Sequence, residues 1–323
     1  MTTIWITGGK GFIGRHLARH CAERGASVLG IGHGLWPPDD AANWSYCHWI
    51  NGEIESSNLS QLAHTSGPPD TVFHLAGGSS VGISLQNPLE DFTRTVETTA
   101  RLLEWMRIHA PDTKIVAVSS AAVYGAGHLK PIHEHAPITP YSPYGYHKSM
   151  MEALCRSYGE NFGLKTGVVR LFSVYGPGLE KQLIWDLCRK LHVDRAGPLT
   201  LGGTGEEMRD WIHVSDAVEL LWLARGACDP KCAHLNGGTG IGIAIKDVAA
   251  EVLRAWGAAP QILFSGTARP GDPGYLVAEI FRARSLGFDP GVAFSRGVQS
   301  AVEWFRSSRG GSLRSDARGS HVR

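Results

Sequence analysis

The chain has 323 residues, of which 43% are hydrophobic and 19% charged, as expected for one large or two modest globular domains with a sizeable core. Lysine and arginine total 31 against 30 acidic residues, so the basic excess typical of nucleic-acid-binding proteins is absent. The sequence contains neither an apolar run long enough to span a membrane nor an N-terminal secretory signal. Its six scattered cysteines indicate reduced thiols, and we expect a cytoplasmic protein that binds neither nucleic acid nor membrane.

Apolar runs and amphipathic stretches alternate along the first half of the chain. This pattern predicts strands at residues 4–6, 28–31, 46–50, 71–75, 114–119 and 166–171, and helices at 12–24, 91–109 and 144–162. The strands are continuous apolar runs, which is typical of parallel sheets covered on both faces. The alternation therefore predicts an α/β fold built on a parallel sheet.

The pattern changes after about residue 172. Helices predicted at 183–191, 216–225, 246–256 and 298–305 are separated by loops rich in glycine and proline and by brief strands. We expect one domain over residues 1–172 and a smaller region over residues 173–306, with some segments interleaved with the first domain. Residues 307–323, rich in Arg, Ser and Gly, are predicted to form a disordered tail.

A glycine-rich turn joins the first predicted strand to the first predicted helix, with the sequence TGGKGFIG at residues 7–14. Gly8, Gly11 and Gly14 permit a tight turn, the close approach of a pyrophosphate, and close packing of helix on strand. The helix N-terminus then offers N–H groups to the phosphates. A three-glycine string is weak evidence alone, but its place between a strand and a helix predicts a dinucleotide site.

A second motif combines a tyrosine and a lysine. Tyr144 and Lys148 are four residues apart in a predicted helix, so both lie on one helical face. An ammonium close to a phenol lowers the pKa of the phenol, which would make Tyr144 an acid or base near neutrality. Ser120 is expected at the end of a strand, where its hydroxyl could bond the same substrate oxygen. The glycine turn upstream favours this catalytic interpretation over an ordinary surface contact.

These motifs, in this order, resemble those of the extended short-chain dehydrogenases/reductases, the NAD(P)-dependent epimerase/dehydratase family that includes epimerases related to UDP-galactose 4-epimerase. Further shared segments are HLAG at 74–77, SSAAVYG at 119–125, SPYGYHK at 142–148, RLFSVYGP at 170–177, RDWIHV at 209–214, NGGTG at 236–240 and RPGD at 269–272. The resemblance implies a Rossmann-type doubly wound parallel sheet, in which residues 1–172 bind the dinucleotide and residues 173–306 mainly bind the substrate. It also implies a nucleotide-diphosphate sugar as substrate, and a homodimer formed through the helices at 91–109 and 144–162.

The resemblance and the residue chemistry together indicate three sets of site residues. The catalytic set is Ser120, Tyr144 and Lys148. The cofactor-binding set is Gly8, Lys10, Gly11, Phe12, Ile13, Gly14, His33, Glu53, Ile54, Leu75, Ala76, Gly77, Tyr144, Lys148 and Phe172. The substrate-binding set is Ser79, Ser80, Ser120, Tyr144, Ser173, Arg209, Arg269 and Asp272. Within it, the two arginines would bind the diphosphate through their forked guanidinium donors.

Several departures from the family pattern narrow the function. Ala121 and Ala122 stand where the dehydratases have an Asp-Glu pair, and neither can move a proton, so water elimination is not expected. Ser173 replaces an Asn that helps to hold the substrate phosphate, and Ser79 replaces a longer polar residue common in the epimerases. We therefore expect a nucleotide-sugar epimerase acting by hydride transfer, with C4 of the sugar as the expected carbon. An NADPH-dependent nucleotide-4-keto-sugar reductase is the alternative.

The sequence offers weak support for two other functions, a serine hydrolase and a non-catalytic dinucleotide sensor, and none for a metal site. The GSSVG segment at 78–82 matches the nucleophile elbow of serine hydrolases, with Ser80 as nucleophile, although such a short match occurs easily in a glycine-rich chain. A non-catalytic dinucleotide sensor is disfavoured by the intact catalytic set. No metal is expected, because Cys228, Cys232 and His234 lack a fourth ligand at zinc-site spacing.

The end of the second predicted strand bears on cofactor choice. NAD-specific sites place an acid there to bind the ribose 2′-hydroxyl, whereas this chain has Gly32. A glycine leaves room for a 2′-phosphate, and Lys10 and His33 could donate to it. The sequence therefore favours NADP over NAD.

Overall fold

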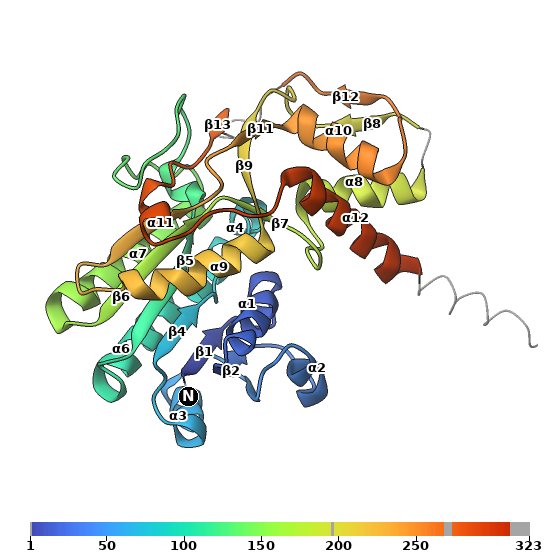
Figure 1. The fold of residues 1–323 in the computed structure, drawn as a ribbon. Helices are drawn as coiled ribbons and strands as arrows, with labels where there is room; N and C mark the ends of the chain where they lie inside the picture. The colour runs from blue at the N-terminus through green and yellow to red at the C-terminus, as the bar shows by residue number, and fades with distance from the viewer. Residues whose placement is uncertain (1, 195–196, 268–272, 311–323) are drawn as a thin grey trace, which may run out of the picture.

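The computed structural model describes residues 2–194, 197–267 and 273–310. Seven parallel strands form the main sheet in the order β10-β6-β5-β4-β1-β2-β3 (Figure 1). They are β1 (Thr3–Thr7), β2 (Ser27–Gly32), β3 (His48–Asn51), β4 (Thr71–His74), β5 (Lys114–Ser120), β6 (Lys165–Leu171) and β10 (Ala233–Gly237). The strand order reverses at β1, which places the ligand crevice beyond the carboxyl ends of β1 and β4. The predicted doubly wound fold of the Rossmann type is confirmed.

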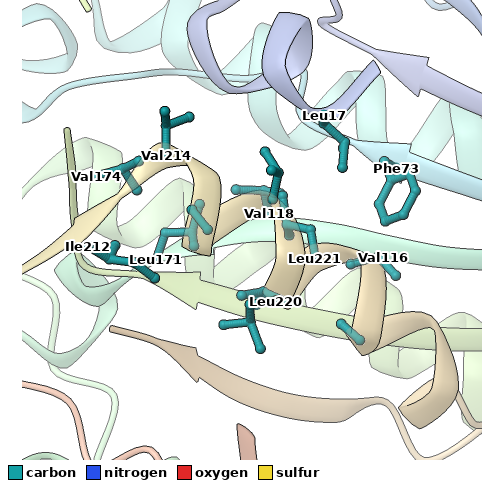
Figure 2. Packing of buried hydrophobic residues seen from close by; sticks show 14 of the residues in the cluster. Leu17, Phe73, Val116, Val118, Leu171, Val174, Ile212, Val214, Leu220 and Leu221 are labelled. Carbon is teal, nitrogen blue, oxygen red and sulfur yellow. The ribbon is translucent and has the colours of Figure 1, made fainter. Parts of the chain in front are cut away.

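Helices cover both faces of this sheet. One face carries α1 (Phe12–Glu23) and α9 (Val214–Ala224), and the other carries α3 (Ser56–Ser66), α6 (Thr98–His109) and α7 (Pro143–Phe162). Figure 2 shows Leu17 of α1 and Leu221 of α9 packed toward Phe73 and Val116 of the sheet. Because successive side chains on a strand point to opposite faces, each buried strand contributes to both cores, which explains its continuous apolar sequence.

The helix predicted at 91–109 is divided into three parts. It consists of α5 (Pro88–Phe92), a π-helical turn over Thr93–Glu97, and α6. The hydroxyls of Thr98 and Thr99 donate to carbonyl oxygens four residues earlier, and such bonds often bend helices. Single π-turns are frequent at functional sites, and this one borders the cavity described below.

The chain beyond residue 172 builds a second layer of structure. Strands β7 (Ser173–Tyr175), β9 (Met208–His213), β11 (Gly242–Ala244) and β13 (Tyr275–Leu276) form one small sheet, and β8 (Leu199–Leu201) and β12 (Ile262–Phe264) another. A separate core lies between α8 (Gln182–Val193), α10 (Ile245–Trp256) and α12 (Phe294–Gly310), at the upper right of Figure 1. Strand β10 and helix α9 return to the main sheet, so this region interleaves with it.

Shorter elements complete the fold, namely α2 (Pro38–Asn43), α4 (Val81–Gln86), α11 (Phe281–Ser285), and brief 3-10 turns at Ala121–Tyr124 and Arg225–Ala227. Helix α12 ends at Gly310 and so includes the first four residues of the predicted tail, 307–310, while residues 311–323 lie outside the described part of the chain. Among the described helices, none combines the length and apolar character required to cross a membrane.

Candidate active site

A cavity of about 590 Å³ extends from the glycine-rich turn to the start of α8. Every predicted site residue that the structure describes lines it, although these residues come from both halves of the chain. Arg269 and Asp272 lie outside the described residues. The walls are formed by the carboxyl ends of β1, β2, β4 and β5, by α7, and by the segments around β7 and β9.

The glycine-rich turn has the geometry that a pyrophosphate site needs. Gly8 has a φ of +66°, and a Cβ there would lie 2.8 Å from the Ala76 nitrogen. A Cβ on Gly14 would lie 2.6 Å from the Gly9 Cα, so a side chain would separate the helix from the turn. Helix α1 begins at Phe12 without a side-chain cap, which leaves its first N–H groups for an anion. These residues fit a dinucleotide.

An aromatic cluster changes the interpretation of Gly32. Trp36, Tyr46 and Trp49 pack together beneath the glycine-rich turn, with ring centroids 4.7–5.5 Å apart. A Cβ on Gly32 would lie 3.1 Å from Cη2 of Trp49, so an indole borders the space that we expected a 2′-phosphate to enter. The ammonium of Lys10 donates to the carbonyl oxygen of Leu35 at 2.6 Å. Both supports for NADP are therefore weaker than the sequence indicated.

Ser120, Tyr144 and Lys148 all line the cavity, and Tyr144 forms a hydrogen bond with Ser120. Lys148 lies 5.9 Å from the centre of the Tyr144 ring and donates to the carbonyl oxygen of Val118 at 2.9 Å. Burial raises the pKa of Tyr144, and a hydrogen bond with Ser120 opposes this rise without cancelling it. The direction is the reverse of the lowering that we expected from the Lys148 ammonium, because burial outweighs the other influences on the phenol.

Lys148 is itself almost completely buried, with 3% of its surface exposed. Burial lowers its pKa to about 8, although the carboxylates of Asp91 and Glu152 oppose the decrease. Asp91 is equally enclosed and lies 2.6 Å from Nδ1 of His147. Sequence reasoning missed this pair, because Asp91 is 56 positions from His147 and lies outside the segments that resemble the family.

A buried chain of polar groups supports the segment after β4. The ring of His74 contacts the hydroxyls of Thr7 at 2.8 Å and Thr99 at 2.9 Å, and burial lowers the pKa of His74 to about 3. Thr95 in the π-turn accepts a hydrogen bond from the Gly78 nitrogen at 2.8 Å. A neutral His74 and the π-turn thus hold residues 75–78, which line the cavity close to Lys148.

The serines of the segment at 78–82 have structural partners. The Ser80 hydroxyl accepts a hydrogen bond from the Ile83 nitrogen at 3.3 Å and caps α4. This serine, the nucleophile of the hydrolase alternative, therefore has a structural role here. The carbonyl oxygen of Ser79 accepts a hydrogen bond from Lys181 at 3.1 Å. Lys181 is among the cavity residues that sequence reasoning did not identify; others are Arg94, Tyr141, Leu179 and Gln182. No local pattern marks these residues.

Comparison with known proteins agrees with this geometry. The model of the NAD dependent epimerase/dehydratase family matches residues 4–236. A UDP-glucose 4-epimerase from Azospirillum brasilense is 32% identical over 327 residues, which cover 94% of this chain and 92% of that protein.

Solved structures show the same similarity. The structure described as MoeE5 in complex with UDP-glucuronic acid and NAD has a TM-score of 0.84 and 31% identity, covering 95% of this chain and 99% of that one. A UDP-glucose 4-epimerase from Thermotoga maritima with UDP-glucose has a TM-score of 0.85 and 25% identity, covering 95% and 100%. The family model over residues 4–236 and the 32% identity over nearly the whole chain show that it belongs to the NAD dependent epimerase/dehydratase family.

Proposed function

We propose that this protein is a nucleotide-sugar 4-epimerase in which Ser120, Tyr144 and Lys148 act on the C4 hydroxyl of the sugar. The observation that carries the proposal is the convergence of these three side chains on a cavity that also contains the dinucleotide-type glycine turn. Relatives named UDP-glucose 4-epimerase support the reaction type. Ala121 and Ala122 beside Ser120 offer no group for water elimination.

Each residue has a distinct task in this proposal. A nicotinamide dinucleotide bound at the glycine-rich turn would supply hydride transfer at the sugar carbon. Tyr144 takes the proton of the C4 hydroxyl and later gives it back, a contribution of roughly 10²–10⁴-fold for general acid–base catalysis. Ser120 orients the same oxygen. Lys148, held against the Val118 carbonyl, places a positive charge beside Tyr144 that favours the phenolate over the phenol.

The remaining predicted residues define the proposed binding surfaces. The helix start at Phe12 and residues 75–77 would hold the dinucleotide, with Glu53 and Ile54 at its adenine. Ser173 and Arg209 line the substrate side, where a guanidinium suits the diphosphate of a nucleotide sugar. We assign Arg269 and Asp272 to the same surface by resemblance alone.

We propose NAD as the cofactor, in preference to the NADP that the sequence favoured. Trp49 borders Gly32 on the side where a 2′-phosphate would need space, and Lys10 already donates to a backbone carbonyl. NAD is the dinucleotide named in the structure of the relative with 31% identity. A reductase that consumes NADPH therefore loses its main support in this chain.

We also propose a homodimer that forms through the outer face of α5 and α7. Several large apolar side chains are exposed there, including Leu89, Phe92, Tyr146 and Met150. Exposed apolar side chains gathered on adjacent helices favour association. Light scattering at micromolar concentration tests this, and a monomeric mass would contradict it.

The function is tested by following UDP-glucose and UDP-galactose, and the corresponding uronic acids, by NMR with catalytic amounts of NAD. An epimerase interconverts one such pair at C4 to equilibrium without net consumption of cofactor. Stoichiometric oxidation of added NADPH with a 4-keto sugar would instead identify a reductase. Absence of turnover at C4 for every pair would contradict the proposal.

A further inference from the structure

Lys181 is a partly buried cation in the cavity wall. Its ammonium donates to the carbonyl oxygen of Ser79 at 3.1 Å, and in the described part of the chain it forms no ion pair with a carboxylate. Arg94, in the same wall, pairs with Glu90 at 2.5 Å. Burial lowers the pKa of Lys181, and no described acidic group acts in the opposite direction. A half-buried cation that lacks an anionic partner is costly in a folded protein.

Lys181 lies directly before a residue with an unusual backbone conformation. Lys181 lies in the connection from β7 to α8 and reaches across the cavity to the segment after β4. The next residue, Gln182, has a φ of +68°, a left-handed conformation that is rare outside glycine and asparagine. Such a conformation persists where the surrounding structure requires it. Gln182 also lines the cavity.

Lys181 lies at the catalytic end of the cavity. Its partner Ser79 follows Gly77 by two residues, and a Cβ on Gly77 would lie 3.3 Å from the Lys148 ammonium. Arg209, which we assign to the diphosphate, lies just before the first residue pair of the parallel β7–β9 ladder, Ser173 and Trp211. Lys181 follows the opposite end of β7. The unpaired charge is therefore placed for the sugar.

We propose that Lys181 binds a carboxylate on the substrate sugar, so that the preferred substrate is a nucleotide-linked hexuronic acid. The inference rests on the proposed function and adds the class of sugar to it. A carboxylate supplies the anion that Lys181 lacks and accepts a charge-assisted hydrogen bond. The hydroxymethyl group of a neutral hexose offers no charge, so binding it leaves the Lys181 ammonium unpaired.

The test measures calorimetric binding of UDP-glucuronate, UDP-glucose and UDP to NAD-saturated protein. The variants are Lys181→Met, which removes the charge at similar length, and Lys181→Arg, which keeps it. Lys190→Met is the matched control, because Lys190 lies on α8, which begins directly after Lys181, and its ammonium also donates to a backbone carbonyl, that of Thr200 at 2.8 Å.

Lys181→Met is expected to weaken UDP-glucuronate binding roughly ten- to a hundred-fold, the range for a hydrogen bond to a charged group. UDP-glucose and UDP should change only a few-fold, Lys181→Arg should retain most of the selectivity, and Lys190→Met should match the parent protein. Equal losses for all three ligands would assign Lys181 to the diphosphate and overturn the inference, as would no loss for any.

Turnover at C4 tests the proposed function separately from the role of Lys181. Parent protein that interconverts UDP-glucose and UDP-galactose at C4 but neither binds nor converts UDP-glucuronate would overturn the role of Lys181 and leave the epimerase standing. Parent protein that binds UDP-glucuronate through Lys181 but turns over no sugar at C4 would overturn the epimerase and leave the carboxylate site standing.

Discussion

The carboxylate of Asp91 lies 2.6 Å from Nδ1 of His147, and only 4% of the Asp91 surface is exposed. His147 lies between Tyr144 and Lys148 on α7, so the pair holds a buried negative charge beside the catalytic residues. The Asp91 charge adds to the rise that burial causes in the pKa of Tyr144, and it opposes the decrease that burial causes in the pKa of Lys148. The other groups facing Lys148 are Glu152, which also raises its pKa, and His74, which is neutral above about pH 3.

Replacing Asp91 is therefore expected to move the pH dependence of catalysis. Asp91→Asn keeps the shape of the side chain and removes its charge, so the pKa values of Tyr144 and Lys148 should both fall. Both the rising and the falling limb of the plot of kcat/KM against pH should therefore shift to lower pH. Glu90→Gln, at an exposed neighbouring acid, should leave the profile in place. An unmoved profile in a folded Asp91→Asn protein would mean that the pair has no electrostatic role.

Tyr144→Phe removes one oxygen from the centre of the cavity. Turnover should fall by roughly 10²–10⁴-fold, the usual contribution of general acid–base catalysis, while NAD binding remains within a few-fold. Steady-state kinetics and fluorescence titration measure the two effects. Tyr146→Phe, at an exposed tyrosine of the same helix, is the control. Activity close to that of the parent would exclude Tyr144 as the acid and base.

A buried ion pair beneath the active site should dominate stability. Arg170 donates to both carboxylate oxygens of Glu152, at 3.0 and 2.7 Å, and both residues are nearly inaccessible. Glu152→Gln leaves the guanidinium without its counter-charge and should cost about 3–5 kcal/mol of unfolding free energy. Chemical denaturation measures this. Glu160→Gln, at an exposed position on the same helix, should change stability by about 0.5 kcal/mol or less.

The same pair predicts how stability depends on pH. Burial by itself raises the pKa of Glu152, but the ring of His234, 3.5 Å away, and the hydrogen bonds from Arg170 outweigh it and lower the pKa to about 2. A carboxyl whose pKa is lower in the folded state stabilises the fold above its ordinary pKa of 4.5. This contribution should be lost as the pH falls from about 4.5 to 2, and Glu152→Gln should lose that dependence. An unchanged acid transition in the variant would contradict the assignment.

Gly32→Asp tests whether a side chain at position 32 can be accommodated beside the indole of Trp49. An aspartate here would serve the ribose in many NAD sites, but its Cβ would crowd the indole at 3.1 Å. The substitution should destabilise the protein by about 1–3 kcal/mol, as overpacking does. Trp49→Phe in the same chain should restore part of the loss. Thermal unfolding of the single and double variants decides this, and a fully stable Gly32→Asp protein would show that the indole moves aside without cost.

The sequence by itself determined the features that depend on local spacing. Apolar periodicity predicted most strands of the main sheet and the helices α1 and α7, although it missed α3 and β10. The glycine turn at 8–14 and the Tyr144–Lys148 pair follow from spacings within one turn and one helix. The family, the parallel sheet and the cavity residues in these motifs could be predicted for that reason, since each motif is specified by residues close together in the chain.

Only the tertiary structure decided the features that depend on residues distant in sequence. The Asp91–His147 pair, the indole of Trp49 against Gly32, and Lys181 against Ser79 each join separate elements, and no local pattern encodes them. Burial also reversed one expectation, because the cost of placing a charge inside the protein raised the pKa of Tyr144 where a neighbouring lysine alone would have lowered it. Desolvation depends on everything packed around a group, and that is known only once the chain has folded.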